Sequence, residues 1–235
     1  MTEPTIRDCI AGPWWTPCEK HPLQRGQYIW AFLPHVDLVP YVLVSEGRSD
    51  PTDHSVARGR VEQLRVSSPP TASNGLPVAG LPSYPKEVWA VNRAKIRLGI
   101  VVCEGGGELP KELRPSSSPK WQTAATFLVA PCYGIEKTST RAGWFQPLVD
   151  RIRRCEYPQF ILEHLPPPYD GTQSIVRLDQ LQPIGKHHNS FKPGEFRLSD
   201  EALQLVDQWF DWLRAGTLDA STELADAREL LMNSD

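Results

Sequence analysis

The chain has 235 residues, of which 40% are hydrophobic and 23% are charged, a balance that is ordinary for a globular protein. Its 23 prolines and 16 glycines are too many for a helix-dominated chain and favour short strands joined by long loops. No apolar run approaches the roughly 20 residues that cross a bilayer, and the N-terminus has no basic-then-apolar signal arrangement. We therefore expect a cytoplasmic protein that does not associate with a membrane.

Charge is distributed unevenly along the sequence, although the formal net charge is only -3. Residues 86–160 carry 12 Lys or Arg against 7 Asp or Glu, whereas residues 199–235 carry 2 against 9. A basic middle suits contact with phosphate groups, and solvated surface of both signs is the simpler alternative.

Potential metal and cofactor ligands are sparse. Five cysteines form an odd set without a CxxC pair, which is typical of neither a disulfide framework nor a zinc ribbon, so we interpret them as reduced and mostly buried. The sequence has no phosphate-binding P-loop and no HExxH motif. The neighbours His187 and His188 would point to opposite sides of a strand, which favours solvated loop histidines over a metal site. No metal or cofactor is therefore expected.

The first half of the chain alternates short apolar segments with irregular ones. Residues 28–33 form an apolar run of β-formers that Pro34 ends, residues 41–45 follow as a second strand, and residues 58–66 alternate weakly. Pro, Ser and Gly dominate residues 67–85, a composition that neither a helix nor a central strand tolerates. We predict a surface loop or a flexible insertion there.

Strand signals return after that segment. Residues 88–91 and 96–103 are predicted to be strands, and a second irregular stretch follows at 108–120. Residues 124–130 predict another buried strand, which we expect Pro131 to end.

A pair of opposite charges stands out in the next part of the chain. After an apolar segment at 157–162, a turn at Asp170-Gly171 leads into a predicted strand at 174–181. Side chains alternate along a strand, so Arg177 and Asp179 should share one face. A carboxylate beside a guanidinium can supply a proton acceptor and a charge stabiliser at a phosphate. Without further context, a surface ion pair is the simpler interpretation.

Two helices are predicted near the C-terminus. Ser199 is a suitable N-cap for a helix that ends at Gly216, and a shorter helix follows at 222–232. The aromatic residues Trp209, Phe210 and Trp212 are interpreted as core or dimer contacts because they follow a helical stripe. Strands followed by helices favour an α+β fold that is mainly β.

The order of several segments is informative. A first strand with a Gly-containing start (25–30) precedes a variable loop, an Arg-led apolar strand (97–102) and a strand that ends at 129–132. The Asp-Gly turn is then followed by the pattern V-x-x-D-Q at 176–180, with an arginine two places before the aspartate. In these motifs and their order the chain resembles the MazF/PemK (Kid) family of toxin–antitoxin endoribonucleases, as a divergent member that carries an insertion. The similarity covers residues 24–35 and 89–215.

This resemblance implies an SH3-like barrel of the PemK/CcdB type, with a C-terminal helix and a long insertion in an early loop. It implies metal-independent cleavage of single-stranded RNA that leaves a 2′,3′-cyclic phosphate and a 5′-OH. Asp179 would be the general base for the ribose 2′-OH, and Arg177 the general acid or the stabiliser of the phosphorane charge. Arg97 matches the arginine that begins a family strand and would contact phosphate.

Further candidate residues complete this expected site. Tyr133 stands where the family usually has threonine, so its hydroxyl would take the catalytic position, or its ring would stack on a base or block the site. The candidate RNA contacts are Arg93, Lys95, Arg97, Arg153, Arg154 and Gln180. An alternative alignment pairs the Arg-led family strand with residues 39–45, which keeps a proline and loses the arginine.

The expected organisation has three parts: an N-terminal extension (1–23), a PemK-like barrel domain (24–216) with an irregular insertion at 46–88, and an acidic C-terminal helix or tail (217–235). The expected partners are single-stranded RNA, a cognate antitoxin protein and a second copy in a homodimer. A variant of this hypothesis places the acidic tail over the chain's own basic groove. Two other hypotheses are an inactive barrel that binds RNA or protein, and a CcdB-like inhibitor of gyrase.

Overall fold

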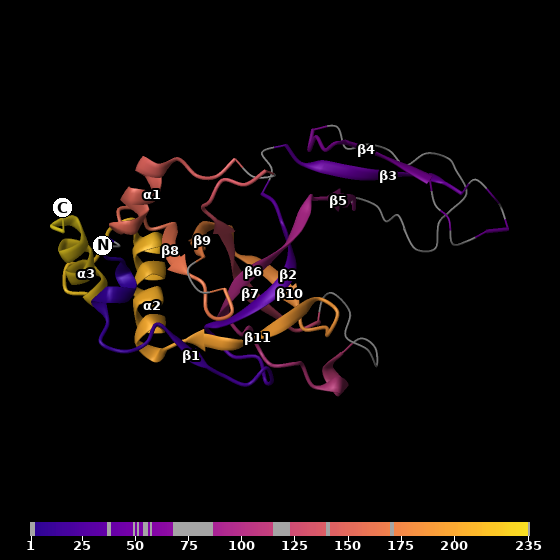
Figure 1. Cartoon of the computed structure of the whole chain (residues 1–235). Helices are drawn as coiled ribbons and strands as arrows, with labels where there is room; N and C mark the ends of the chain where they lie inside the picture. The colour runs from indigo at the N-terminus through magenta and orange to yellow at the C-terminus, as the bar shows by residue number, and fades with distance from the viewer. Residues whose placement is uncertain are drawn as a thin grey trace. The chain divides into compact units, whose positions relative to one another are not determined.

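The computed structural model of the chain describes residues 3–36, 39–48, 50, 52–53, 56, 58–67, 87–114, 123–139, 142–169 and 172–234. The chain divides into two compact units: unit 1 combines Met1–Leu33 with Ile96–Asp235, and unit 2 is Pro34–Lys95. Antiparallel strands make up most of the described elements, and three α-helices accompany them (Figure 1). The expected α+β class with mainly β content is therefore confirmed.

The main sheet contains eight strands among the described residues, in the order β1-β11-β2-β6-β7-β9-β8, with β10 also paired to β7. Its strands are β1 (Trp15–Pro17), β2 (Gln27–Pro34), β6 (Ala94–Cys103), β7 (Thr126–Gly134), β8 (Phe160–His164), β9 (Gln173–Arg177), β10 (Gln182–Gly185) and β11 (Phe191–Leu198). The apolar runs predicted at 28–33 and 96–103 lie within β2 and β6. Both strands are central because their side chains can be buried on both faces.

The expected closed barrel is not formed, because no backbone pairing among the described strands joins β1 to β8. Side chains connect these two ends of the sheet instead. The Trp15 indole Nε1 donates hydrogen bonds to the carbonyl of His164 (2.9 Å) and to Oε1 of Glu163 (3.1 Å), and Trp14 Nε1 donates to Oε2 of Glu163. Two bulky indoles therefore occupy the place where adjacent backbones would approach to about 4.8 Å in a closed ladder.

Strand β7 passes through Pro131 and ends at Gly134, so the expectation that Pro131 ends this strand is wrong. The residues before it, Thr126 to Val129, pair with β10, and the residues after it, Cys132 to Gly134, pair with β9. Neither of these two ladders includes the proline. A residue without a backbone N–H is tolerated at such a change of partner.

The helices are α1 (Gln146–Arg153), α2 (Asp200–Ala215) and α3 (Glu223–Met232), and three short 3-10 turns are η1 (Ile6–Cys9), η2 (Lys111–Leu113) and η3 (Leu178–Gln180). The predicted start of α2 is confirmed, because the Ser199 hydroxyl accepts a hydrogen bond from the Ala202 N–H (3.2 Å). Gly216 ends the helix in the left-handed conformation, with φ of 75°. Of the three aromatic residues expected to make core or dimer contacts, Trp209 and Trp212 are buried in the core and Phe210 is partly buried against it.

Both ends of the chain contribute to the core of unit 1. Ile6, Trp14 and Trp15 from the N-terminal segment are buried in the same cluster as Leu224 and Leu231 of α3. Figure 1 shows α3 beside α2 and the N-terminal turn. The acidic residues 217–235 therefore include a helix that packs on the core, and the hypothesis that they cover a basic groove stays a prediction.

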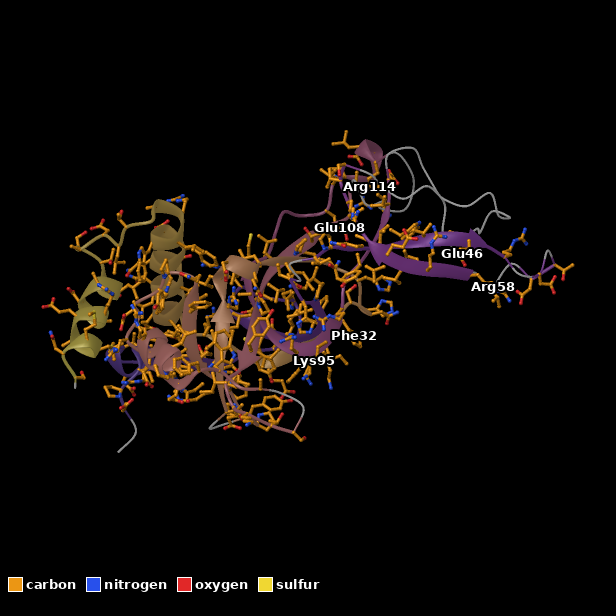
Figure 2. The ribbon with its side chains drawn as sticks, turned by 90° about the horizontal axis from the view of Figure 1, so that it is seen from above. Phe32, Glu46, Arg58, Lys95, Glu108 and Arg114 are labelled. Atoms are coloured by element: carbon orange, nitrogen blue, oxygen red, sulfur yellow. The ribbon has the colours of Figure 1, made fainter. Side chains whose placement is uncertain are left out.

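Unit 2 is a three-stranded antiparallel sheet in the order β4-β3-β5, made of β3 (Tyr41–Gly47), β4 (Arg58–Gln63) and β5 (Trp89–Val91). Glu46 and Arg58 lie along its β3–β4 hairpin (Figure 2). The unit spans more residues than the insertion expected at 46–88, because it also includes β3 and its partner β5. Residues 68–86 of the Pro-rich segment and the Asp170-Gly171 turn lie outside the described residues.

All five cysteines are free thiols. Cys132 and Cys155 are buried, Cys9 and Cys18 are half-buried, and Cys103 is exposed, so the expectation that most of them are buried is wrong. None of the helices in the described part of the chain is both long and apolar enough to span a membrane.

Candidate functional site

Arg177 and Asp179 form a two-pronged ion pair. The Nε of Arg177 donates to Oδ1 of Asp179 (2.8 Å), and its Nη2 donates to Oδ2 (2.7 Å). The predicted strand at 174–181 is too long: β9 ends at Arg177, and residues 178–180 form η3. This 3-10 turn buries Leu178 and leaves Asp179 exposed. Arg177 and Asp179 therefore meet because the turn follows the strand, and not because alternate residues of a longer strand share a face.

Tyr133 lies beside this ion pair and links two further candidates. Its hydroxyl donates a hydrogen bond to Oε1 of Gln180 (2.7 Å), and the guanidinium carbon of Arg97 lies 4.3 Å from the centre of its ring. The β6–β7 register pairs Gly99 with Pro131, so continuation by two residues brings Arg97 opposite Tyr133. Five predicted site residues therefore gather at neighbouring ends of β6, β7 and β9: Arg97, Tyr133, Arg177, Asp179 and Gln180.

The electrostatics of Tyr133 reflect these neighbours. Burial raises the pKa of its phenol most strongly, the charges of Arg97 and Arg177 lower the pKa, and the carboxylate of Asp179 raises it; the net direction is upward. The hydroxyl therefore stays protonated at neutral pH. A neutral phenol can donate a hydrogen bond or a proton to a phosphate oxygen.

Phe160 supports the ion pair from the adjacent strand, a role that no sequence pattern indicated. It is the cross-strand partner of Arg177 in the β8–β9 ladder, and the Arg177 guanidinium carbon lies 4.8 Å from the centre of its ring. Edge-to-face contacts with Trp144 (6.0 Å) and Tyr157 (6.1 Å) hold the ring in place. Because the ring packs against the face of the guanidinium, the N–H edge of Arg177 is left to pair with Asp179.

The cluster has the groups that RNA transesterification requires. Asp179 offers a carboxylate oxygen that could accept a proton, and Arg177 and Arg97 offer positive charge for the phosphate oxygens in the transition state. Because the ribose 2′-OH is an internal nucleophile, a protein needs to supply only orientation, proton transfer and charge stabilisation.

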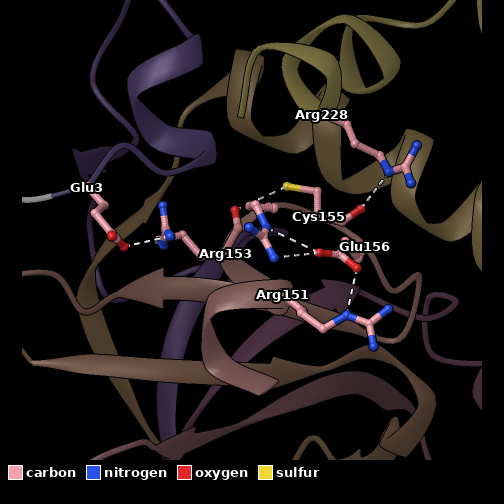
Figure 3. Close-up of polar contacts among 7 residues, drawn as sticks. Glu3, Arg151, Arg153, Cys155, Glu156 and Arg228 are labelled. Carbon is pink, nitrogen blue, oxygen red and sulfur yellow. Dashed lines mark hydrogen bonds and ion pairs between the residues drawn. The ribbon is translucent and has the colours of Figure 1, made fainter. Parts of the chain in front are cut away.

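The basic residues at the end of α1 make other contacts (Figure 3). Arg153 pairs with Glu3 of the N-terminal segment, Arg154 pairs with Glu156 (3.2 Å), and Arg151 also pairs with Glu156 (2.7 Å). Helix α1 itself was not predicted. The charges of the expected RNA contacts Arg153 and Arg154 are thus neutralised by nearby glutamates. Their ion pairs do not involve Arg177 or Asp179.

Two other expected RNA contacts belong to unit 2. The backbone carbonyl of Arg93 accepts a hydrogen bond from the N–H of His35 (2.7 Å), and Lys95 is the last residue of this unit (Figure 2). Their assignment to RNA stays a prediction.

Metal ligands do not converge at any point of the described ranges, where no group of three His, Cys, Asp or Glu side chains could hold an ion. The rings of His187 and His188 lie 4.2 Å apart, centre to centre, in a loop between β10 and β11. No family model, no curated protein and no solved structure matches this chain.

Proposed function

We propose that the chain is a metal-independent endoribonuclease that cleaves single-stranded RNA, as the toxin of a toxin–antitoxin pair. The observation that carries this proposal is the convergence of Arg97, Tyr133, Arg177 and Asp179 at adjacent strand ends. The sequence resemblance to the MazF/PemK family, including its SH3-like fold, belongs to the same proposal.

Each side chain has a distinct role in the proposed reaction. Asp179 takes the proton of the 2′-OH, whose oxygen attacks the adjacent phosphorus and forms the cyclic phosphate. Arg177 and Arg97 stabilise the negative charge that develops on the phosphorane oxygens. The leaving 5′-oxygen receives its proton from Arg177 or from the neutral hydroxyl of Tyr133, which Gln180 orients.

The proposed partners follow from the same resemblance. They are a second copy of the chain in a homodimer, and an antitoxin whose acidic segment competes with RNA for the arginines of the site. Opposite charge on the antitoxin would favour rapid association.

One observation favours a second function, namely RNA binding without cleavage. Both carboxylate oxygens of Asp179 already accept hydrogen bonds from Arg177, so the proposed base is engaged. Each oxygen keeps a lone pair that can accept a proton, but protonation of Asp179 would weaken its ion pair with Arg177. A catalytically inactive module would keep this ion pair intact.

A cleavage assay with EDTA separates the two functions. A labelled single-stranded RNA of mixed sequence is incubated with the full chain and with the variants Arg177→Ala and Asp179→Ala. The matched control is Arg214→Ala, because Arg214 also pairs with an aspartate (Asp211, 2.9 Å), on an exposed part of α2.

The nuclease proposal expects cleavage by the unaltered chain and by Arg214→Ala, with a loss of at least about a hundredfold in the other two variants. Products that end in a 2′,3′-cyclic phosphate identify the reaction. Tight binding of the RNA without cleavage would replace the proposal by the binding module. Equal cleavage by all four proteins would exclude this site as its origin.

A further inference from the structure

A cavity lies within unit 1, away from the arginine cluster. It has a volume of about 580 Å³ and is lined by the N-terminal segment (Glu3 to Trp14), one side of α1 and the ends of β8 and β9. This volume falls in the range of roughly 300–1,000 Å³ that is usual for ligand pockets. His164 and Gln173, which line it, pair at one end of the β8–β9 ladder, whereas Phe160 and Arg177 pair at the other.

The two sites are therefore separate. Four residues of extended strand between Gln173 and Arg177 correspond to about 13 Å. Helix α1 packs on β8, with Val149 and Ile152 buried against Leu162 and Ile175 of the β8–β9 pair. Ligand binding in the cavity can therefore be tested independently of the proposed nuclease site.

Hydrogen-bond donors in the wall of the cavity lack partners. Arg7 forms no hydrogen bond or ion pair with any residue that the structure describes, and Arg153 Nε is buried without a partner. The Gln173 amide lies 2.8 Å from His164 Nε2, which accepts its hydrogen bond. In a neutral imidazole the hydrogen must then sit on Nδ1, which is also buried without a partner among the described residues.

Neutral His164 agrees with its surroundings. Burial lowers the pKa of its imidazole most strongly, and the positive charge of Arg7 lowers it further, against the opposing effect of Asp8. Arg7 and His164 line the same cavity.

The acidic residues of the wall are already engaged. Glu3 accepts from Arg153, Asp150 accepts from the Gln146 amide (2.8 Å), and Asp8 accepts from the backbone N–H of Thr5 (2.8 Å) and from its hydroxyl (3.1 Å). Each of the three carboxylates is thus held through one oxygen by a neighbour in the wall, whereas Arg7, Arg153 Nε and His164 Nδ1 have no such partner among the described residues. A buried donor without a partner is unfavourable, and a ligand with acceptor oxygens would remove that cost.

We propose that this cavity binds an oxyanion carried by a small molecule no larger than a mononucleotide, with Arg7, Arg153 and His164 as its donors. Arginine suits this role because its planar fork binds carboxylate and phosphate groups with two parallel hydrogen bonds. Arg153 Nε and His164 Nδ1 are covered by neighbouring atoms, so both side chains turn slightly toward the cavity when the anion binds.

Isothermal titration calorimetry of the full chain at low ionic strength tests this proposal. The probes are AMP, inorganic phosphate and citrate, with adenosine as the uncharged counterpart of AMP. Titrations are repeated with Arg7→Gln and Arg153→Gln, and with two controls: Arg154→Gln, whose residue neighbours Arg153 but does not line the cavity, and Arg177→Gln in the other site.

We expect at least one of the three anions to bind with saturation, adenosine not to bind, and the affinity to fall at least about tenfold in Arg7→Gln while both controls keep it. Binding of phosphate and AMP identifies a phosphate ligand, and binding of citrate alone identifies a carboxylate. The variant Arg153→Gln also loses the ion pair with Glu3 and could unfold for that reason. In that case the titration with Arg7→Gln decides the test. No saturable binding, unchanged affinity in Arg7→Gln, or loss in Arg177→Gln would overturn the proposal, whatever the outcome of the RNA assay.

Discussion

Glu163 gives a sharp prediction about stability and pH. It is 1% exposed, next to the last residue of β8, and each of its carboxylate oxygens accepts a hydrogen bond from a different tryptophan, Trp14 and Trp15. Burial raises its pKa to about 8, and it outweighs the indole hydrogen bonds and the charge of Arg7, which favour the ionised form. At neutral pH the side chain is therefore mostly protonated in the folded chain.

The sign and size of the effect follow from linkage. The folded pKa of about 8 is higher than the unfolded value of 4.5, so the folded state binds the proton more tightly. The resulting stabilisation is fully present below pH 4.5 and is lost as pH rises through 8. A difference of about 3.5 pH units at 1.36 kcal/mol per unit corresponds to roughly 5 kcal/mol of unfolding free energy.

The variant Glu163→Gln removes the titration and keeps the shape of the side chain. Its amide N–H₂ cannot accept a hydrogen bond, so one indole loses its acceptor, at a cost of about 1–3 kcal/mol that does not depend on pH. We expect the variant to be less stable than the unaltered chain at pH 5 and more stable at pH 8.5. The two stability curves should cross between these values.

Urea unfolding followed by tryptophan fluorescence, at half-unit steps from pH 5 to pH 9, measures both curves. The difference in unfolding free energy should change by about 1.4 kcal/mol per pH unit between pH 5 and pH 8. Parallel curves over this interval would refute the reasoning, because they would mean that Glu163 has the same pKa in the folded and unfolded chain.

Three further predictions concern other parts of unit 1. Burial raises the pKa of Glu156, but hydrogen bonds from Arg151 and Arg154 and their charges lower it overall. The unaltered chain therefore loses stability as Glu156 is protonated below pH 4.5, and the variant Glu156→Gln should lose less. Acid titration followed by circular dichroism measures this difference. Leu224→Ala should lower the unfolding free energy by about 2–5 kcal/mol, because this α3 side chain is fully buried, whereas Leu230→Ala, at 63% exposure, should change it by less than about 0.5 kcal/mol in urea unfolding. Tyr133→Phe should cost about 1 kcal/mol in the same measurement and lower RNA cleavage at least about tenfold, since the hydroxyl is lost and the ring is kept.

The elements that sequence patterns predicted are those whose signals are local. β2 and β6 were visible as apolar runs, because a strand buried on both faces needs an almost continuous run of apolar residues. The start and end of α2 were visible because Ser199 and Gly216 have specific conformational roles at the helix termini.

The missed elements depend on distant partners. β11 has no alternating pattern and contains Pro193 and Gly194, yet it pairs with both β1 and β2. Gly194 is required there by packing: a Cβ atom would lie 2.2 Å from the Tyr28 ring. Helix α1 has eight residues, Pro147 in its first turn and no side-chain cap, so tertiary packing on β8 and not propensity determines it.

The candidate site was predictable in part for the same reason. The spacing of Arg177 and Asp179 was enough to suggest their pairing, although the turn that follows the strand was not foreseen. The contact of Tyr133 with Gln180 spans 47 positions and depends on the β7–β9 pairing, and Phe160 reaches Arg177 only through the β8–β9 register. No local pattern encodes such neighbours.

Strand β8 connects the stability of unit 1 to its candidate sites. Its alternate side chains point to opposite faces: Glu163 meets the two tryptophans that join the ends of the sheet, while Phe160 supports Arg177 and His164 lines the cavity. Ionisation of Glu163 above pH 8 places a charge in the core on one face of a five-residue strand whose other face positions both sites. Loss of RNA cleavage or anion binding at high pH should therefore be compared with Glu163→Gln, which keeps β8 uncharged, before it is assigned to a group within either site.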